Sequence, residues 1–263
     1  MKRSLAFLAL CAALAASAVA ASAAPKASSP AGPREPAVVA LPPSAALSGL
    51  QEQGFAVLEP GTFMSQDAEA AFEAEWRRRL RIKRGRDNQL YLYYKDYDDR
   101  WGKTSEKVRR FIYRQTAKLR AALPGEDFDL RMATIQVSDR KVPRAGDPHI
   151  DRNASYHLVL SYPLGPRSRG TVVYPPGRSR KPRAIEAGPR SAAVFAGIGR
   201  ELATGRPAIV HAAPAGKVRR RAVLLLAYVT RGAPAVEKLP RRLVAAAVRR
   251  QRALARRLAA ATR

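Results

Sequence analysis

Hydrophobic and polar positions divide the chain into an N-terminal part that alternates helices with strands and a later part rich in short strands. The apolar run 55–58 ends at Pro60-Gly61 and predicts a first strand. Asp67 can cap a helix that places Phe72, Trp76 and Leu80 on one face. A β-prone stretch at 91–94 precedes a second helix, capped by Thr104. Its buried face would contain Val108, Phe111, Ile112, Gln115 and Leu119.

Beyond residue 128 the pattern changes to short β-prone runs separated by glycine and proline. The predicted strands are 130–137, 156–162, 170–174, 191–195, 208–211 and 220–230. Many short strands at regular spacing indicate a barrel or a jelly roll. We therefore expect an α+β domain over residues 47–235, with a β core at 130–230 and supporting helices on its N-terminal side.

The last segment, 236–263, predicts a basic amphipathic helix that begins near Pro240. Its narrow apolar stripe consists of Leu243, Ala247, Leu254 and Leu258. The rest of its surface is dominated by Arg241, Arg242, Arg249, Arg250, Arg252, Arg256 and Arg257. Such a helix can lie on an anionic membrane surface, pack on the domain or form a frayed tail.

The N-terminus has the features of an export signal. Residues 1–23 combine Lys2 and Arg3 with an apolar run and small residues at the expected cleavage sites, which predicts a signal peptide and a periplasmic or secreted protein. Residues 24–46 are rich in proline and alanine and predict a stiff, disordered linker. The chain's one cysteine, Cys11, would be removed with the signal. The mature protein would then have no disulfides, thiolate catalysis or cysteine-bound metal.

The formal net charge of +27 favours anionic partners, such as a membrane surface or a polysaccharide. A solvated arginine-rich surface without a partner accounts for the same number. Nucleic acid is disfavoured, because the basic stretches lack the interleaved aromatic residues on which single-stranded bases stack.

The candidate chemistry lies in the triplet His149-Ile150-Asp151. Alternate residues of a strand share a face, so His149 and Asp151 point the same way. His211 follows 60 residues after Asp151 and supplies a possible third ligand. Two histidines and one carboxylate that leave open coordination positions form the facial triad of non-haem Fe(II) oxygenases. His157, the remaining histidine, is expected to be structural.

Residues from about 132 to 229 resemble the Fe(II)/2-oxoglutarate-dependent dioxygenase superfamily, near its prolyl-hydroxylase-like branch. The resemblance rests on motif order: His149-Ile150-Asp151 precedes a hydrophobic strand, 156–162. A glycine-led strand and a strand that ends in phenylalanine follow, at 170–175 and 188–195. His211 is then followed by Gly216 and Arg220.

The resemblance implies a double-stranded β-helix, also called a jelly roll, with His149, Asp151 and His211 as metal ligands and catalytic centre. It implies Fe(II) as the metal and 2-oxoglutarate as co-substrate. Arg220 would bind the distal carboxylate of 2-oxoglutarate, with Arg221 as the second choice in a run of three arginines. The implied activity is hydroxylation of an unidentified protein or small molecule.

Two other functions remain open at this level. A cupin-like metal oxygenase without 2-oxoglutarate is possible, because the strand 135–139 lacks the tyrosine common in the family and Ala222 stands where a serine or threonine is common. A non-enzymatic basic protein that binds an anionic envelope polymer is the other. The tyrosines at 91–97 are expected to pack rather than to contact a ligand.

Overall fold

The computed structural model describes residues 45–83, 86–97, 99–139, 148–151, 156–165, 168–176, 183–214, 221–232 and 240–261. The predicted signal peptide and nearly all of the predicted linker lie outside these ranges, so export and the domain boundaries remain predictions. Among the described residues, no helix has the length and apolarity needed to cross a membrane.

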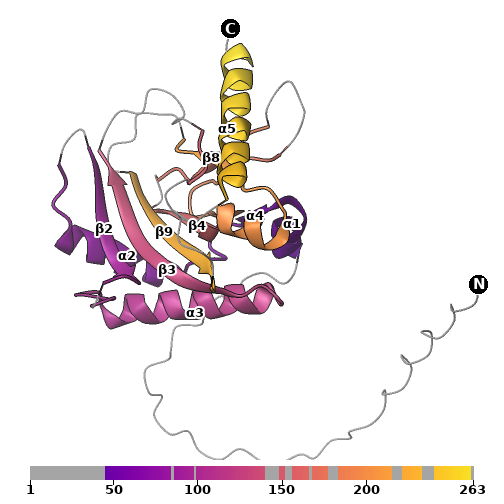
Figure 1. The fold of residues 1–263 in the computed structure, drawn as a ribbon. Helices are drawn as coiled ribbons and strands as arrows, with labels where there is room; N and C mark the ends of the chain where they lie inside the picture. The colour runs from indigo at the N-terminus through magenta and orange to yellow at the C-terminus, as the bar shows by residue number, and fades with distance from the viewer. Residues whose placement is uncertain are drawn as a thin grey trace, which may run out of the picture. The chain divides into compact units, whose positions relative to one another are not determined.

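A six-stranded antiparallel sheet forms the centre of the described fold (Figure 1). Its strand order is β1 (Phe55–Leu58), β7 (Ala192–Ala196), β4 (Tyr156–Leu164), β9 (Arg221–Thr230), β3 (Phe128–Ser138) and β2 (Asp87–Tyr94). β3 and β9 are rich in β-branched and aliphatic residues, as expected for central strands.

A smaller antiparallel sheet contains β6 (Ile185–Glu186), β5 (Val172–Tyr174) and β8 (Val210–Ala212). His149 adds an antiparallel bridge to His211 at the β8 edge of this sheet. The bridge consists of two backbone hydrogen bonds, of 2.8 and 2.9 Å, between these two residues.

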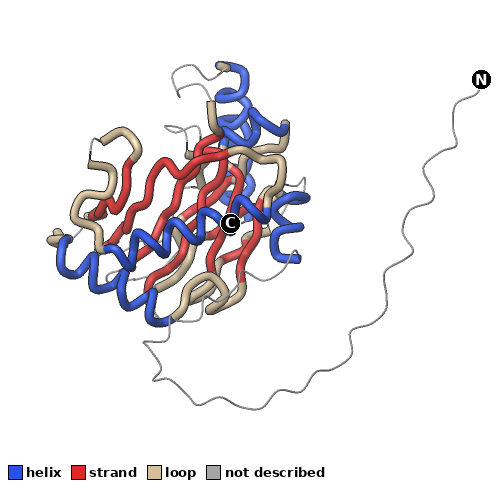
Figure 2. The backbone as a smooth tube through the Cα atoms, turned by 90° about the horizontal axis from the view of Figure 1, so that it is seen from below, coloured by secondary structure: helices blue, strands red, loops and turns tan. Residues whose placement is uncertain are grey.

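Helices α2 (Gln66–Arg79) and α3 (Glu106–Ala122) cover one face of the larger sheet, and Figure 2 shows helices running across its strands. Ser65 caps α2, since its side chain accepts a hydrogen bond from the Ala68 amide, so the predicted cap Asp67 is wrong. Ser105 occupies the cap position of α3. The predicted cap, Thr104, instead donates its hydroxyl to the Leu92 carbonyl.

Helix α5 (Arg241–Ala261) packs on the smaller sheet, with α4 (Ile198–Thr204) beside it (Figure 1). Alternation along the strands separates three hydrophobic clusters. One lies against α2 and α3; another, with Phe55, Val159 and Phe195, contains residues from both sheets; the third joins β5 and β8 to α5. This arrangement confirms the predicted α+β double-stranded β-helix with N-terminal supporting helices.

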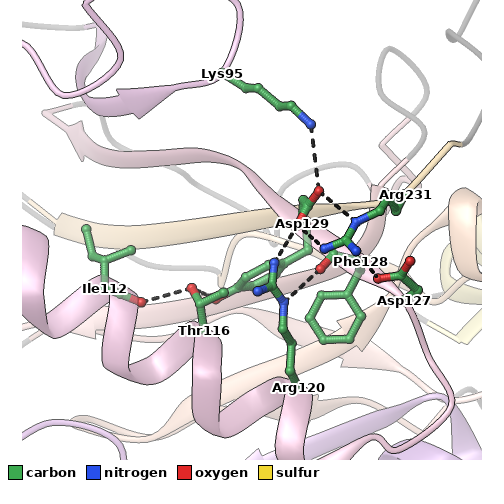
Figure 3. Close-up of polar contacts among 9 residues, drawn as sticks. Lys95, Ile112, Thr116, Arg120, Asp127, Phe128, Asp129 and Arg231 are labelled. Atoms are coloured by element: carbon green, nitrogen blue, oxygen red, sulfur yellow. Dashed lines mark hydrogen bonds and ion pairs between the residues drawn. The ribbon is translucent and has the colours of Figure 1, made fainter.

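Charged side chains fasten α3 to the ends of β3 and β9 (Figure 3). Arg120 of α3 donates to Asp129 at 2.5 Å, and Arg231, just after β9, donates to the same carboxylate at 3.1 Å. These hydrogen bonds, that of Arg231 above all, hold the pKa of Asp129 below its usual range. The helix layer is thus joined to the ends of two central strands as well as to the sheet through the apolar core.

Candidate metal centre

His149, Asp151 and His211 lie together, and we call them the ligand triad. Each offers one ligand atom within 4.8 Å of the other two. Nε2 of His149 lies 3.8 Å from one oxygen of Asp151, and Nε2 of His211 lies 3.7 Å from the other. The structure therefore brings together the three residues predicted from the sequence. Their role as metal ligands remains a prediction.

The surroundings of His211 favour a free Nε2 electron pair. The ring is 8% exposed and lies 4.4 Å, centroid to centroid, from the Phe195 ring. Nδ1 faces the Ile209 carbonyl at 3.3 Å, and because a carbonyl only accepts, Nδ1 is the donor. The contact of Nδ1 with the Ile209 carbonyl favours the tautomer that leaves Nε2 available to a metal.

The carboxylate of Asp151 is held in its charged form. Burial alone would raise the pKa of Asp151, but the nearby ring of His211, and to a smaller extent that of His149, outweighs it and lowers that pKa. An ionised carboxylate beside two imidazoles is a donor set suited to Fe(II) with open coordination positions. The residues present therefore fit the iron site that the sequence predicts.

A cavity of about 600 Å³ opens beside the ligand triad, with His149 and Asp151 in its wall. Three phenols line it: Tyr91, Tyr94 and Tyr156. Three carboxamides line it as well: Gln89, Gln136 and Gln251. Its apolar wall is formed by Met132, Ile150, Val159, Leu225 and Ala227. A cavity of this size can hold a small ligand or a protruding part of a larger one.

Among the described residues, the wall of the cavity carries little charge. Asp151 is the one acidic side chain among the described lining residues, and no lysine or arginine is found among them. Burial, followed by the negative charge of Asp151, raises the pKa of Tyr156 to about 12. Burial also raises the pKa of Tyr91. Both phenols are therefore uncharged at neutral pH and can donate hydrogen bonds.

Several lining residues escaped the sequence analysis. The rings of Tyr91 and Tyr94 pack on each other at 5.6 Å between centroids, as expected, and both also line the cavity. Tyr91 is 44% exposed. A register shift between Tyr91 and Tyr93 in β2 locally breaks the strand's alternation. In the sequence, Gln136 stands out only as part of the strand 135–139, which lacks a tyrosine. No local pattern distinguishes Gln251 from the other polar positions of its helix.

Arg220, the predicted co-substrate anchor, lies outside the described residues. Arg221 opens β9 on the same strand face as Leu225 and Ala227, which line the cavity. Its guanidinium donates to the backbone carbonyls of Arg169, at 2.7 Å, and Gly170, at 3.3 Å. Burial lowers the pKa of Arg221 to about 10, so the group is charged at neutral pH.

The side chain of His157 contacts residues other than those of the ligand triad. It is 1% exposed, and its two ring nitrogens contact the Thr230 hydroxyl at 2.7 Å and the Glu126 carboxylate at 2.5 Å. The ring stacks on Phe128 at 5.2 Å between centroids. These contacts agree with the structural role expected from the sequence.

Comparison with solved structures shows that the fold is similar to that of one class of proteins, the Fe(II)/2-oxoglutarate oxygenases. This confirms, at the level of the fold, the resemblance seen in the sequence. The sequence itself matches no protein-family model. It matches no curated protein either.

Three structures of this class each superpose with a TM-score of 0.50. One is an oxidoreductase of the 2OG-Fe(II) oxygenase family from Burkholderia pseudomallei, 14% identical over 74% of this chain and 93% of its own. A Pseudomonas putida prolyl-4-hydroxylase is 16% identical over 72% of this chain and 98% of its own. The α-ketoglutarate-dependent epimerase SnoN of nogalamycin biosynthesis is 16% identical over 70% and 82%. A hydroxylase and an epimerase share this fold, so the fold alone does not define the reaction.

Proposed function

We propose that the protein is a non-haem Fe(II)/2-oxoglutarate-dependent oxygenase that hydroxylates its substrate. The observation that carries the proposal is the ligand triad, whose two histidines and one carboxylate adjoin a cavity in a double-stranded β-helix. A solvated cluster of acidic residues would account for neither the two imidazoles nor the cavity. When bound, Fe(II) with 2-oxoglutarate supplies the activation of dioxygen that this chemistry requires.

The chain's own residues would hold and orient the reactants. His149, Asp151 and His211 would hold the metal, next to the cavity that His149 and Asp151 line. Arg221 or Arg220 would bind the distal carboxylate of 2-oxoglutarate through a forked, charge-assisted hydrogen bond. Apolar side chains such as Leu225 and Val159 would exclude water from the reacting centre.

The cavity lining supports a substrate whose reacting part is uncharged. Phenols and carboxamides both donate and accept hydrogen bonds, and tyrosine rings offer flat apolar faces. Within the described wall, no cation is placed to neutralise an anionic substrate, although the chain carries a charge of +27. Hydroxyl, amide or ring groups of a protein or small molecule meet this requirement.

An anaerobic Fe(II) titration of the purified protein, with and without 2-oxoglutarate, tests the proposal. We expect a visible charge-transfer band that needs both components and disappears in His149→Ala. The control His157→Gln, which alters a histidine outside the ligand triad, should keep the band if it folds. Tight iron binding without the band would favour the cupin-like oxygenase, and a lack of iron binding would favour the non-enzymatic binding protein.

We further propose that the protein is exported and contacts an anionic envelope surface. The export signal in residues 1–23 and the net charge of +27 support this. The exposed side of α5 presents Arg241, Arg242, Arg249, Arg252 and Arg256. The apolar stripe of α5 packs against the domain, which favours an electrostatic contact over insertion of this helix into lipid.

A further inference from the structure

The residues next to the ligand triad pack toward the C-terminal helix. Ile150 separates His149 from Asp151, and Val210 and Ala212 flank His211. Neighbours on a strand point to opposite faces, so Val210 and Ala212 of β8 belong to the face opposite His211, whereas Ile150 lies between the cavity wall and the cluster that contains α5. All three are buried, at 3%, 7% and 1% exposed.

This opposite face and α5 share one hydrophobic cluster. Ile150, Val210 and Ala212 belong to it together with Ala247 and Leu254 of α5, which are 2% and 5% exposed. Helix α5 therefore backs both ligand-bearing segments at once. The predicted apolar stripe of the helix is used for this contact.

A partly buried ion pair connects α5 to the segment that leads into β8. Arg250 donates through both terminal nitrogens to Glu201 of α4, at 2.9 and 2.5 Å. Glu201, 8% exposed, also accepts the Ala208 amide at 2.9 Å, three residues before His211. A forked pair of this kind fixes direction as well as distance.

Helix α5 also extends to the cavity. Gln251, next to Arg250 in the chain, lines the cavity together with His149 and Asp151. The helix is therefore adjacent to the ligand-bearing strands on their outer side and to the cavity wall.

We propose that α5 is a structural part of the metal centre, with Leu254 and Arg250 as positioning residues that hold the two ligand-bearing segments together. The effect on metal affinity rests on the proposed function. The support of the two segments by α5 does not, and it can be measured without any metal.

Hydrogen–deuterium exchange of the metal-free protein tests this support. The backbone amide of His149 donates to the carbonyl of His211, and the amide of His211 donates to the carbonyl of His149, so loss of the support should expose both amides to exchange. Leu254→Asp places a carboxylate in the buried cluster. We expect amide exchange at 148–151 and 208–212 to accelerate about tenfold or more, while β3 and β9 keep their protection. Ala255→Asp adds the same charge at the exposed neighbouring position and should exchange like the parent, as should Leu254→Met.

Fe(II) titration of the same variants gives the second readout. We expect Leu254→Asp to weaken Fe(II) binding about tenfold or more, as loss of supporting contacts around a metal site does, and Ala255→Asp to leave it unchanged. If Leu254→Asp fails to fold, Leu254→Ala removes the same contact without a charge.

Unchanged exchange at 148–151 and 208–212, in a folded variant whose α5 amides have lost protection, would overturn the proposal. Equal acceleration in Ala255→Asp would do so as well. A parent protein that binds no Fe(II) would contradict the proposed function, whereas the exchange result would still decide the role of α5.

Discussion

Arg221 illustrates how the position of one residue within a strand decides what its side chain can reach. Leu225 and Ala227 line the cavity, and Arg221 precedes them on the same face of β9. Its charged group is satisfied by two backbone carbonyls, which a carboxylate of 2-oxoglutarate could replace with a stronger, ionic partner. We therefore take Arg221, the second choice from the sequence, as the first residue to test for this role.

We therefore expect Arg221→Gln to raise the Kd for 2-oxoglutarate by roughly 10- to 100-fold, the usual worth of hydrogen bonds to a charged group. Arg220→Gln removes the same charge and should change that Kd less than about threefold. Titration of the Fe(II)-loaded protein with 2-oxoglutarate measures both. A larger effect of Arg220→Gln would restore the choice based on spacing.

The lining phenol Tyr156 leads to a second prediction at this scale. Its pKa, raised to about 12 first by burial and then by Asp151, keeps the hydroxyl protonated throughout the range in which enzymes are assayed. Tyr156→Phe removes a neutral donor and leaves the charge of the cavity unchanged. Turnover, once a substrate is known, should therefore fall without any change in its pH profile between pH 6 and 9. A titration that the parent shows in that range and the variant lacks would show that Tyr156 ionises in the parent.

Among the elements, α1, α4 and β4 are joined by one buried network. Arg200 of α4, 1% exposed, donates to both oxygens of Glu126 at 3.0 and 2.6 Å and to the Leu50 carbonyl of α1 at 2.7 Å. His157 of β4 contacts the same carboxylate. Burial alone would raise the pKa of Glu126, but its bonds to His157 and Arg200 prevail and lower it to about 2.

Glu126→Gln should reduce the free energy of unfolding at pH 7 by about 3 kcal/mol, because it leaves the buried Arg200 without its counter-charge. A folded pKa below the unfolded one gives stability that is complete above about pH 5 and disappears as the pH falls toward 2. The difference between parent and variant should shrink over that window. Urea unfolding from pH 7 to pH 3 measures it.

Glu52→Gln, which changes an exposed carboxylate of α1, is the matched control and should leave stability nearly unchanged. An undiminished gap between parent and Glu126→Gln at pH 3 would show that the carboxylate acts through packing rather than charge.

For the whole molecule, the distribution of charge separates two surfaces. The described cavity wall is nearly neutral, whereas the exposed side of α5 carries arginines without an acidic residue in the helix. Electrostatic attraction would thus bring the protein to an anionic surface and leave the choice of substrate to the neutral cavity.

We expect binding to anionic lipid vesicles, little binding to neutral ones, and a steep loss of binding as salt increases. The triple variant Arg249→Gln, Arg252→Gln and Arg256→Gln should weaken vesicle binding without affecting Fe(II) affinity, because all three side chains are exposed. Co-sedimentation at two salt concentrations measures this. Selective binding to an anionic polysaccharide would identify that polymer as the surface, and binding to neither would contradict an anionic partner.

The sequence by itself determined the features that depend on local periodicity. Helical spacing located α2, α3 and α5, and short β-prone runs located most of the strands, because the periods of 3.6 and 2 are set within a segment. The triplet His149-Ile150-Asp151 placed two ligands on one face for the same reason. The short elements α1, α4 and β6 were missed, since few residues carry too weak a pattern.

Only the tertiary structure decided which distant segments meet. The bridge between His149 and His211, the position of α5 behind the ligand strands and the reach of Gln251 to the cavity all join residues far apart in the chain. The apolar stripe of α5 was compatible with a membrane surface as well as with the domain. Packing against Ile150 and its neighbours decided for the domain, because burial depends on the surface that is available in space and not on the stripe alone.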